Sequence, residues 1–176
     1  LPIYLDKLVI GGDSAGAYYS ATLANLATNP EFSEKVNVKA DLKINALALI
    51  CGIYNIELAL GKKMPFDFAN KLLLDFIGYK IKDMAGYEYH DALSPFNYVT
   101  KDFPRAFISF AKKDIFCGGQ GEALTKKLQG YGTQVVNASS KLFKDNHCYS
   151  LMWKGKAAKT HNEILSGFLK DIKEGK

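Results

Sequence analysis

The sequence contains a single arginine, Arg105, although 23 of its 176 residues are basic and its formal net charge is +5. Nucleic-acid-binding proteins rely on arginine for bidentate contacts with phosphate and guanine. The lysines are scattered along the chain rather than gathered into one basic segment. We therefore interpret the positive charge as a solvated surface and expect no nucleic-acid partner.

Cysteine is also scarce. Cys51, Cys117 and Cys148 are odd in number and show no C-x-x-C spacing, so the sequence indicates neither a disulfide framework nor a zinc motif. A reducing, cytoplasmic compartment fits this cysteine usage best. We expect neither a cofactor nor a metal ligand set.

Long apolar runs are missing too. No run approaches the ~20 residues of a membrane span, and residues 1–6 have neither a basic start nor the apolar stretch of a signal peptide. The sequence begins with Leu1 rather than methionine, a few residues before an expected core strand. We therefore expect that an upstream segment is missing.

The remaining composition, 48% hydrophobic and 23% charged, is that of one globular domain with a substantial core. Strand-like apolar runs alternate with helical patterns. The expected strands are 7–11, 44–51, 105–111 and a short one from 134 to 136, and the expected helices are 15–28, 121–129 and 156–173. This alternation predicts an α/β fold with a mostly parallel sheet covered by helices on both faces.

Two segments depart from this rhythm. Residues 31–43 are polar, and we interpret them as a connection. Residues 53–100 are expected to form a cap-like insertion within the single domain 1–176. Apolar residues at helical spacing over 66–77, ended by Gly78, predict a helix there. Such a helix could form a lid over a ligand pocket, or it could pack only on the outer face of the sheet.

The most informative motif is Gly12-Asp13-Ser14-Ala15-Gly16, a G-x-S-x-G between an expected strand and helix. This spacing is that of a nucleophile elbow, in which a sharp turn lifts the serine hydroxyl clear of the sheet. The flanking glycines leave room for strand and helix to pass closely. The helix N-terminus directs N–H groups towards Ser14, where an oxyanion would develop.

A serine nucleophile needs a base, and three histidines are available. His161 lies among polar residues of the last helix, where a surface position is expected. His90 lies in the inserted segment. His147 follows the last strand and precedes the last helix, where the base of a Ser-acid-His chain order belongs. We therefore favour His147 as the base. The alternative is a surface or capping role for this residue.

The base in turn needs an orienting carboxylate. Asp114 follows the strand 105–111 at its carboxyl end, where parallel sheets gather their sites. Asp145 is too close in sequence to His147 to approach its ring from behind. Asp102 precedes the strand, and Asp91 lies in the insertion. We therefore expect Asp114 to be the acid.

Together, these residues resemble those of a known family. Gly11–Gly16 looks like the GDSAG elbow of the hormone-sensitive-lipase-like esterases, the α/β-hydrolase fold-3 family. Ser94-Pro95 before a strand, Asp114 after it, and the step from Asp114 to His147 are also similar to that family. The resemblance covers nearly the whole chain, and the elbow is its most specific part.

The resemblance implies a carboxylesterase that acts on short acyl esters through an acyl-enzyme. Ser14 would attack the carbonyl, His147 would transfer the proton, and Asp114 would orient His147. The backbone N–H of Ala15 would be one oxyanion donor. The residues expected to contact the substrate are Asp13, Phe66, Phe68 and Leu73.

The chain also departs from the family. The family carries a His-Gly-Gly-Gly motif upstream of the elbow, which supplies other oxyanion donors. This motif is absent from the sequence, and Ala17 stands where many members carry glycine. A second hypothesis is therefore a truncated, non-catalytic module that binds a ligand or partner without turnover. The strand 7–11 would leave one edge unpaired, so we expect self-association, or pairing with the missing N-terminal segment, and weak activity.

Overall fold

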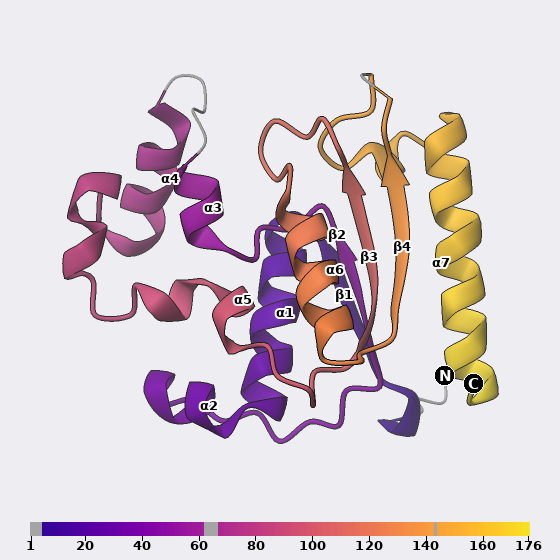
Figure 1. Cartoon of the computed structure of the whole chain (residues 1–176), viewed down its shortest axis with the longest axis horizontal. Helices are drawn as coiled ribbons and strands as arrows, with labels where there is room; N and C mark the ends of the chain where they lie inside the picture. Colours follow the sequence, from indigo (N-terminus) through magenta and orange to yellow (C-terminus); the bar gives the residue numbers. More distant parts are fainter. Residues whose placement is uncertain (1–4, 62–66, 143) are drawn as a thin grey trace.

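The structure is a computed structural model that describes residues 5–61, 67–142 and 144–176. Its centre is a sheet of four parallel strands in the order β1-β2-β3-β4 (Figure 1). The strands are β1 (Val9–Asp13), β2 (Ala46–Ile50), β3 (Arg105–Ala111) and β4 (Val135–Ser140). Parallel pairing brings all four carboxyl ends to one edge of the sheet. The prediction of a parallel α/β sheet is confirmed.

The strands are apolar because the sheet is covered on both faces. Leu47 and Leu49 of β2 are fully buried, and so are Ala106 to Ile108 of β3. Leu49 is paired with Ile108, which fixes the register of the two central strands. Strands buried on both faces show continuous apolar runs rather than an alternating pattern.

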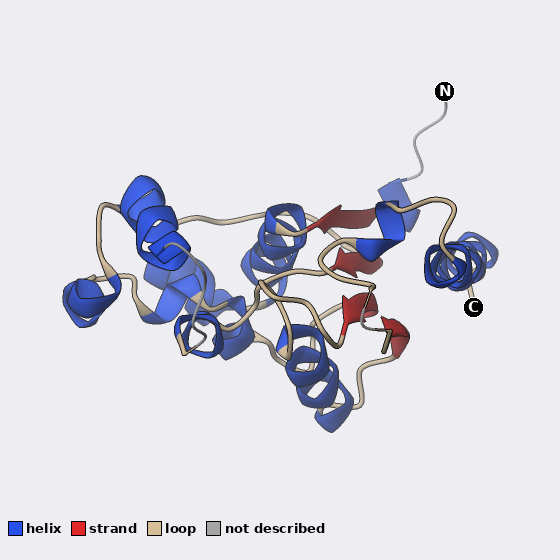
Figure 2. Ribbon diagram, turned by 90° about the horizontal axis from the view of Figure 1, so that it is seen from above, coloured by secondary structure: helices blue, strands red, loops and turns tan. Residues whose placement is uncertain are grey.

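Three helices form the covering layers. Helices α1 (Ala15–Thr28) and α6 (Gln120–Gly130) lie on one face of the sheet, and α7 (Lys156–Glu174) lies on the other (Figure 2). Buried Ala17, Ala21 and Ala24 let α1 lie close to the strands. Among the described residues, no helix is both long and apolar enough to cross a membrane.

Helix α2 (Pro30–Val36) replaces the polar connection expected over residues 31–43, so that expectation is wrong for these residues. The Asn29 side chain accepts a hydrogen bond from the Phe32 N–H, and Pro30 occupies the first turn, which together start a helix. Phe32 is buried and its ring packs on Tyr98, 4.6 Å between centroids. This long-range contact gives the short helix its apolar anchor.

Strand β4 is longer than predicted, because it continues through Asn137 to Ser140. The polar side chain of Asn137 is accommodated by hydrogen bonds to Thr125 Oγ1 and to the Ile108 carbonyl. Apolar content alone therefore marked only the first part of this edge strand.

The described residues between 53 and 100 form a helical lobe beside the sheet (Figure 1). The lobe contains α3 (Ile56–Leu60), α4 (Phe68–Ile77), η3 (Ile81–Gly86), η4 (Asp91–Leu93) and α5 (Pro95–Tyr98). Gln120, at the start of α6, anchors the first residues of this lobe, because its Oε1 accepts hydrogen bonds from the N–H groups of Tyr54 and Asn55. The described residues also form two short helices outside this lobe, η1 (Leu5–Lys7) and η5 (Tyr149–Leu151).

Candidate active site

The turn between β1 and α1 holds Ser14 in an unusual backbone conformation, with φ 52° and ψ −116°. Such values cost free energy for a residue with a side chain and persist only where the surroundings enforce them. Here the Ser14 N–H donates to the Ile50 carbonyl at 2.8 Å. A side chain at Gly12 would lie 2.5 Å from the backbone of Gly16, so glycine is required where strand and helix cross.

His147 lies in the loop between β4 and α7, 133 residues from Ser14 in sequence. Its Nε2 is 2.9 Å from Ser14 Oγ, and its Nδ1 is 2.9 Å from Asp114 Oδ2. The ring therefore bridges the hydroxyl and the carboxylate. With the proton on Nδ1 donated to Asp114, Nε2 is free to accept the hydroxyl proton of Ser14.

Asp114 follows β3 and is almost completely buried, 5% exposed. Its Oδ1 accepts the backbone N–H groups of Phe116 and Cys117, both at 2.8 Å. Burial by itself raises the pKa of Asp114, but the bonds from His147, Cys117 and Phe116 outweigh it and hold that pKa below its usual value. The carboxylate is therefore ionised at neutral pH and keeps one oxygen for His147.

Asn146 links the two loops that carry these side chains, and sequence reasoning missed it. Its Oδ1 accepts from the N–H of Ile115 at 3.1 Å and from that of His147 at 2.8 Å. The Phe116 ring meets the His147 ring edge-on, 5.3 Å between centroids. The only available signal in the sequence was the position of Asn146 next to the expected base.

A cavity of about 560 Å³ opens at Ser14 and His147. Its remaining lining is apolar or aromatic and comes from α1, the 53–100 lobe and the loop after β3. These residues are Ala15, Tyr18, Tyr19, Ile53, Ile56, Leu72, Leu73, Phe76, Ile77, Leu93, Phe116 and Cys117. Burial raises the pKa of Tyr18, so its phenol stays neutral. No Asp, Glu, Lys or Arg lines the part of the cavity formed by described residues.

The residues expected to contact substrate lie in different places relative to the cavity. Leu73 lines the cavity, whereas Phe66 and the side chain of Phe68 fall outside the described part of the structure. Asp13 is exposed and does not belong to the lining; its Oδ2 lies 3.7 Å from Cys148 Sγ. Ala15 begins α1 at the cavity wall, where a helical N–H lacks an intrahelical acceptor.

The other titratable candidates lie elsewhere. His161 is 2% exposed between the rings of Phe107 and Tyr149, so the expected surface position is wrong. It faces the sheet from α7, and burial lowers its pKa. His90 pairs with Glu57 of α3 at 2.7 Å, and Asp145 accepts from Ser140 Oγ.

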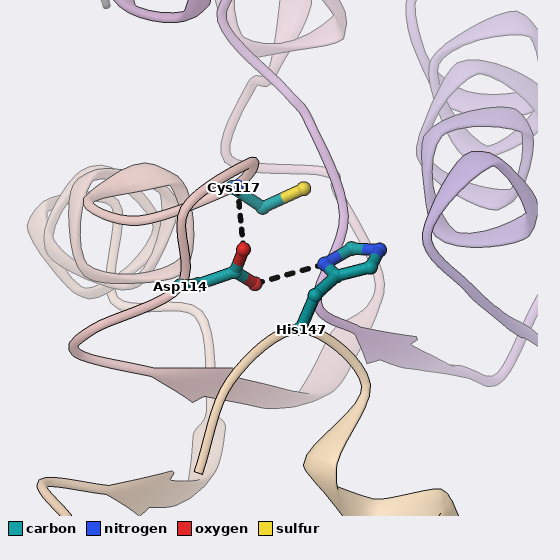
Figure 3. Close-up of side chains that lie close together, drawn as sticks. All are labelled: Asp114, Cys117 and His147. Atoms are coloured by element: carbon teal, nitrogen blue, oxygen red, sulfur yellow. Dashed lines mark hydrogen bonds and ion pairs between the residues drawn. The ribbon is translucent and has the colours of Figure 1, made fainter. Parts of the chain in front are cut away.

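Among the described residues, Asp114, Cys117 and His147 form a group that could hold a cation. One potential ligand atom from each lies within 4.8 Å of the other two. Figure 3 shows the three side chains converging from the loop after β3 and the loop before α7. The carboxylate and imidazole already share a hydrogen bond, so a cation would have to displace its proton.

Comparison with solved structures identifies the fold. Esterase B from Lactobacillus rhamnosis matches with a TM-score of 0.74 and 22% identity, over 98% of this chain and 55% of that one. A fungal esterase from Rhizomucor miehei matches at 0.64 and 18%, over 97% and 53%. The acylaminoacyl peptidase of Pyrococcus horikoshii matches at 0.67 and 18%, over 93% and 23%.

The chain therefore has the α/β-hydrolase fold, and it spans about 55% of the length of esterase B. No family model matches the sequence, and no curated protein matches it.

Proposed function

We propose that this chain is the triad-bearing part of a serine carboxylesterase, related to the hormone-sensitive-lipase-like esterases. One observation carries the proposal: Asp114, His147 and Ser14 are joined by two hydrogen bonds of 2.9 Å at the wall of an apolar cavity. Esterases among the structures of similar fold support the reaction class. The strained backbone of Ser14 also supports a nucleophile.

In the proposed reaction Ser14 Oγ attacks the ester carbonyl while His147 Nε2 takes its proton. Asp114 keeps the other proton on Nδ1 and stabilises the imidazolium that forms. The Ala15 N–H donates to the oxyanion at the positive end of α1. The tetrahedral intermediate collapses, the alcohol leaves with the proton from His147, and Ser14 remains acylated. Water activated by His147 then releases the acid and restores Ser14.

The cavity indicates which esters fit. Its lining brings no Asp, Glu, Lys or Arg from the described residues, so a charged acyl group would lose its hydration without gaining a partner. Uncharged esters with short acyl chains match this chemistry. Leu72, Leu73 and Phe76 of α4 line the cavity, which supports a cap formed by residues 53–100 rather than a purely outer helix.

The test is hydrolysis of p-nitrophenyl acetate and butyrate by the wild-type chain and by Ser14→Ala. We expect a rate loss of at least about 1,000-fold in Ser14→Ala, because the nucleophile is removed. Ser166→Ala is the matched control, since Ser166 is exposed on α7 and remote from the cavity lining. Equal rates for wild type and Ser14→Ala would refute the proposal.

The second candidate is a module that binds an ester-like ligand without turnover. One observation favours it: the chain spans about 55% of the length of esterase B. Within the chain, the oxyanion donor that we propose is the Ala15 N–H. In that case wild type and Ser14→Ala would both bind a non-hydrolysable ketone analogue of the ester and neither would hydrolyse the ester.

A further inference from the structure

The loop after β3 places a thiol beside the Asp114–His147 pair. Cys117 is 3% exposed, and its side chain lies beside the Asp114 carboxylate and the His147 ring (Figure 3). One potential ligand atom from each of the three residues lies within 4.8 Å of the others. The proposed hydrolysis gives the Cys117 thiol no role.

The spacing suits a small tetrahedral cation. Zinc binds nitrogen and oxygen at about 2.1 Å and thiolate sulfur at about 2.3 Å, so neighbouring ligands lie about 3.4–3.6 Å apart. The Asp114–His147 pair is tighter than this, at 2.9 Å. Opening the pair by about half an ångström would bring it to the zinc spacing. The Cys117 sulfur lies within 4.8 Å of a ligand atom of each residue of that pair.

The charges and the access route also suit a divalent cation. A thiolate from Cys117, the carboxylate of Asp114 and a neutral imidazole carry two negative charges, which balance Zn²⁺ or Cd²⁺. Cys117 and His147 both line the cavity, so an ion can reach them from that side. Three protein ligands leave a fourth position for water.

We propose that Asp114, Cys117 and His147 form an inhibitory site for a thiophilic divalent cation such as Zn²⁺. Binding at Nδ1 replaces the hydrogen bond to Asp114 and moves the imidazole proton to Nε2. The Cys117 thiol releases its proton to solvent, so one proton leaves for each ion bound. Nε2 then carries hydrogen towards Ser14 and cannot accept the hydroxyl proton.

The inhibitory part of this inference rests on the proposed esterase function, whereas binding itself does not. Binding is therefore measured first in the Ser14→Ala chain, with Cd²⁺ as probe and ultraviolet thiolate-to-cadmium charge transfer as readout. We expect one ion per chain, one proton released, and affinity that rises with pH. Adding Cys117→Ser should weaken binding by more than about 100-fold, beyond the effect of losing an outer-shell partner.

The matched control is Cys148→Ser in the same background, because Cys148 lies beside Asp13 rather than in the cluster. It should keep the charge-transfer band. Thermal unfolding of both cysteine variants shows that each is folded. A band retained in Cys117→Ser, or no band in the parent chain with excess Cd²⁺, would overturn the site.

The regulatory part is measured in the wild-type chain as ester hydrolysis with and without Zn²⁺. Zinc should abolish hydrolysis, and a chelator should restore it. Full activity with the site occupied would overturn the inhibition while leaving the esterase intact. If the chain hydrolyses no ester at all, the proposed function fails and the cadmium result still decides the site.

Discussion

At the residue scale, Gly12 is a position of the elbow where the structure leaves no room for a side chain. Gly12→Ala would place a methyl carbon 2.5 Å from the Gly16 backbone, and backbone cannot move aside cheaply. We expect a loss of about 1–3 kcal/mol in the free energy of unfolding, together with displacement of Ser14. Urea unfolding measures the first effect and ester hydrolysis the second.

Gly16→Ala is the paired control for that prediction. A side chain at Gly16 meets no atom within 4 Å, and the residue lies in the first turn of α1. We expect unchanged or slightly higher stability, since alanine is the better helix former. Equal destabilisation by the two substitutions would contradict the assigned role of Gly12.

His161 makes stability depend on pH. Burial lowers its pKa in the folded state, so the unfolded chain, with a pKa near 6.5, binds the proton more readily. Its contribution is complete above about pH 6.5 and is lost as pH falls towards the lower folded pKa. His161→Phe keeps an aromatic ring between Phe107 and Tyr149 and should flatten the decline, measured by urea unfolding from pH 7 to 5. An unchanged slope would argue against this origin.

At the scale of elements, the proposed triad depends on how two loops are held together. Asn146 bonds to Ile115 in one loop and to the backbone of His147 in the other. Asn146→Ala should lower kcat about 10- to 100-fold with little change in KM, because His147 is misplaced while the cavity is intact. We classify Asn146 as a positioning residue.

Asn146→Asp separates positioning from general loop stability. Its carboxylate can accept both N–H groups, so the geometry should be kept and most of kcat restored. Loss of kcat in Asn146→Asp equal to that in Asn146→Ala would contradict positioning through these bonds.

The elements that local sequence encodes could be predicted, and those that tertiary contacts create could not. The elbow from β1 to α1 depends on residues 7–16, where glycine spacing and an apolar strand lie together. Helix α2 has local start signals in Asn29 and Pro30, but its apolar side is buried only because Phe32 packs on Tyr98, far along the chain. The burial of His161 follows from packing of α7 on Phe107, which helical periodicity did not reveal.

The candidate site divides in the same way. The G-x-S-x-G motif selected Ser14 as a candidate, and chain order and the carboxyl ends of parallel strands selected His147 and Asp114, because such a sheet gathers its carboxyl ends at one edge. Asn146 and Cys117 became visible only with side-chain geometry. Their contacts join separate loops, so no local sequence pattern indicates them.

At the scale of the whole molecule, β1 is an edge strand of the sheet formed by the described residues. The Ser14 N–H and the Leu8 carbonyl bond towards β2, so by alternation the N–H groups of Val9, Gly11 and Asp13 face away from it. An edge of this kind promotes association. We expect self-association in sedimentation, with slower amide exchange at these three residues as concentration rises. A monomer at all concentrations, with exchange unchanged, would contradict this.

In the proposed reaction, Ser14 is a nucleophile activated by His147. A fluorophosphonate probe tests it most directly, because the activated hydroxyl displaces fluoride and keeps the phosphonyl group. Mass spectrometry of the labelled chain and its peptides should find one adduct, on Ser14, formed much more slowly in His147→Ala. No adduct, or an adduct on another residue with Ser14 unmodified, would contradict the account.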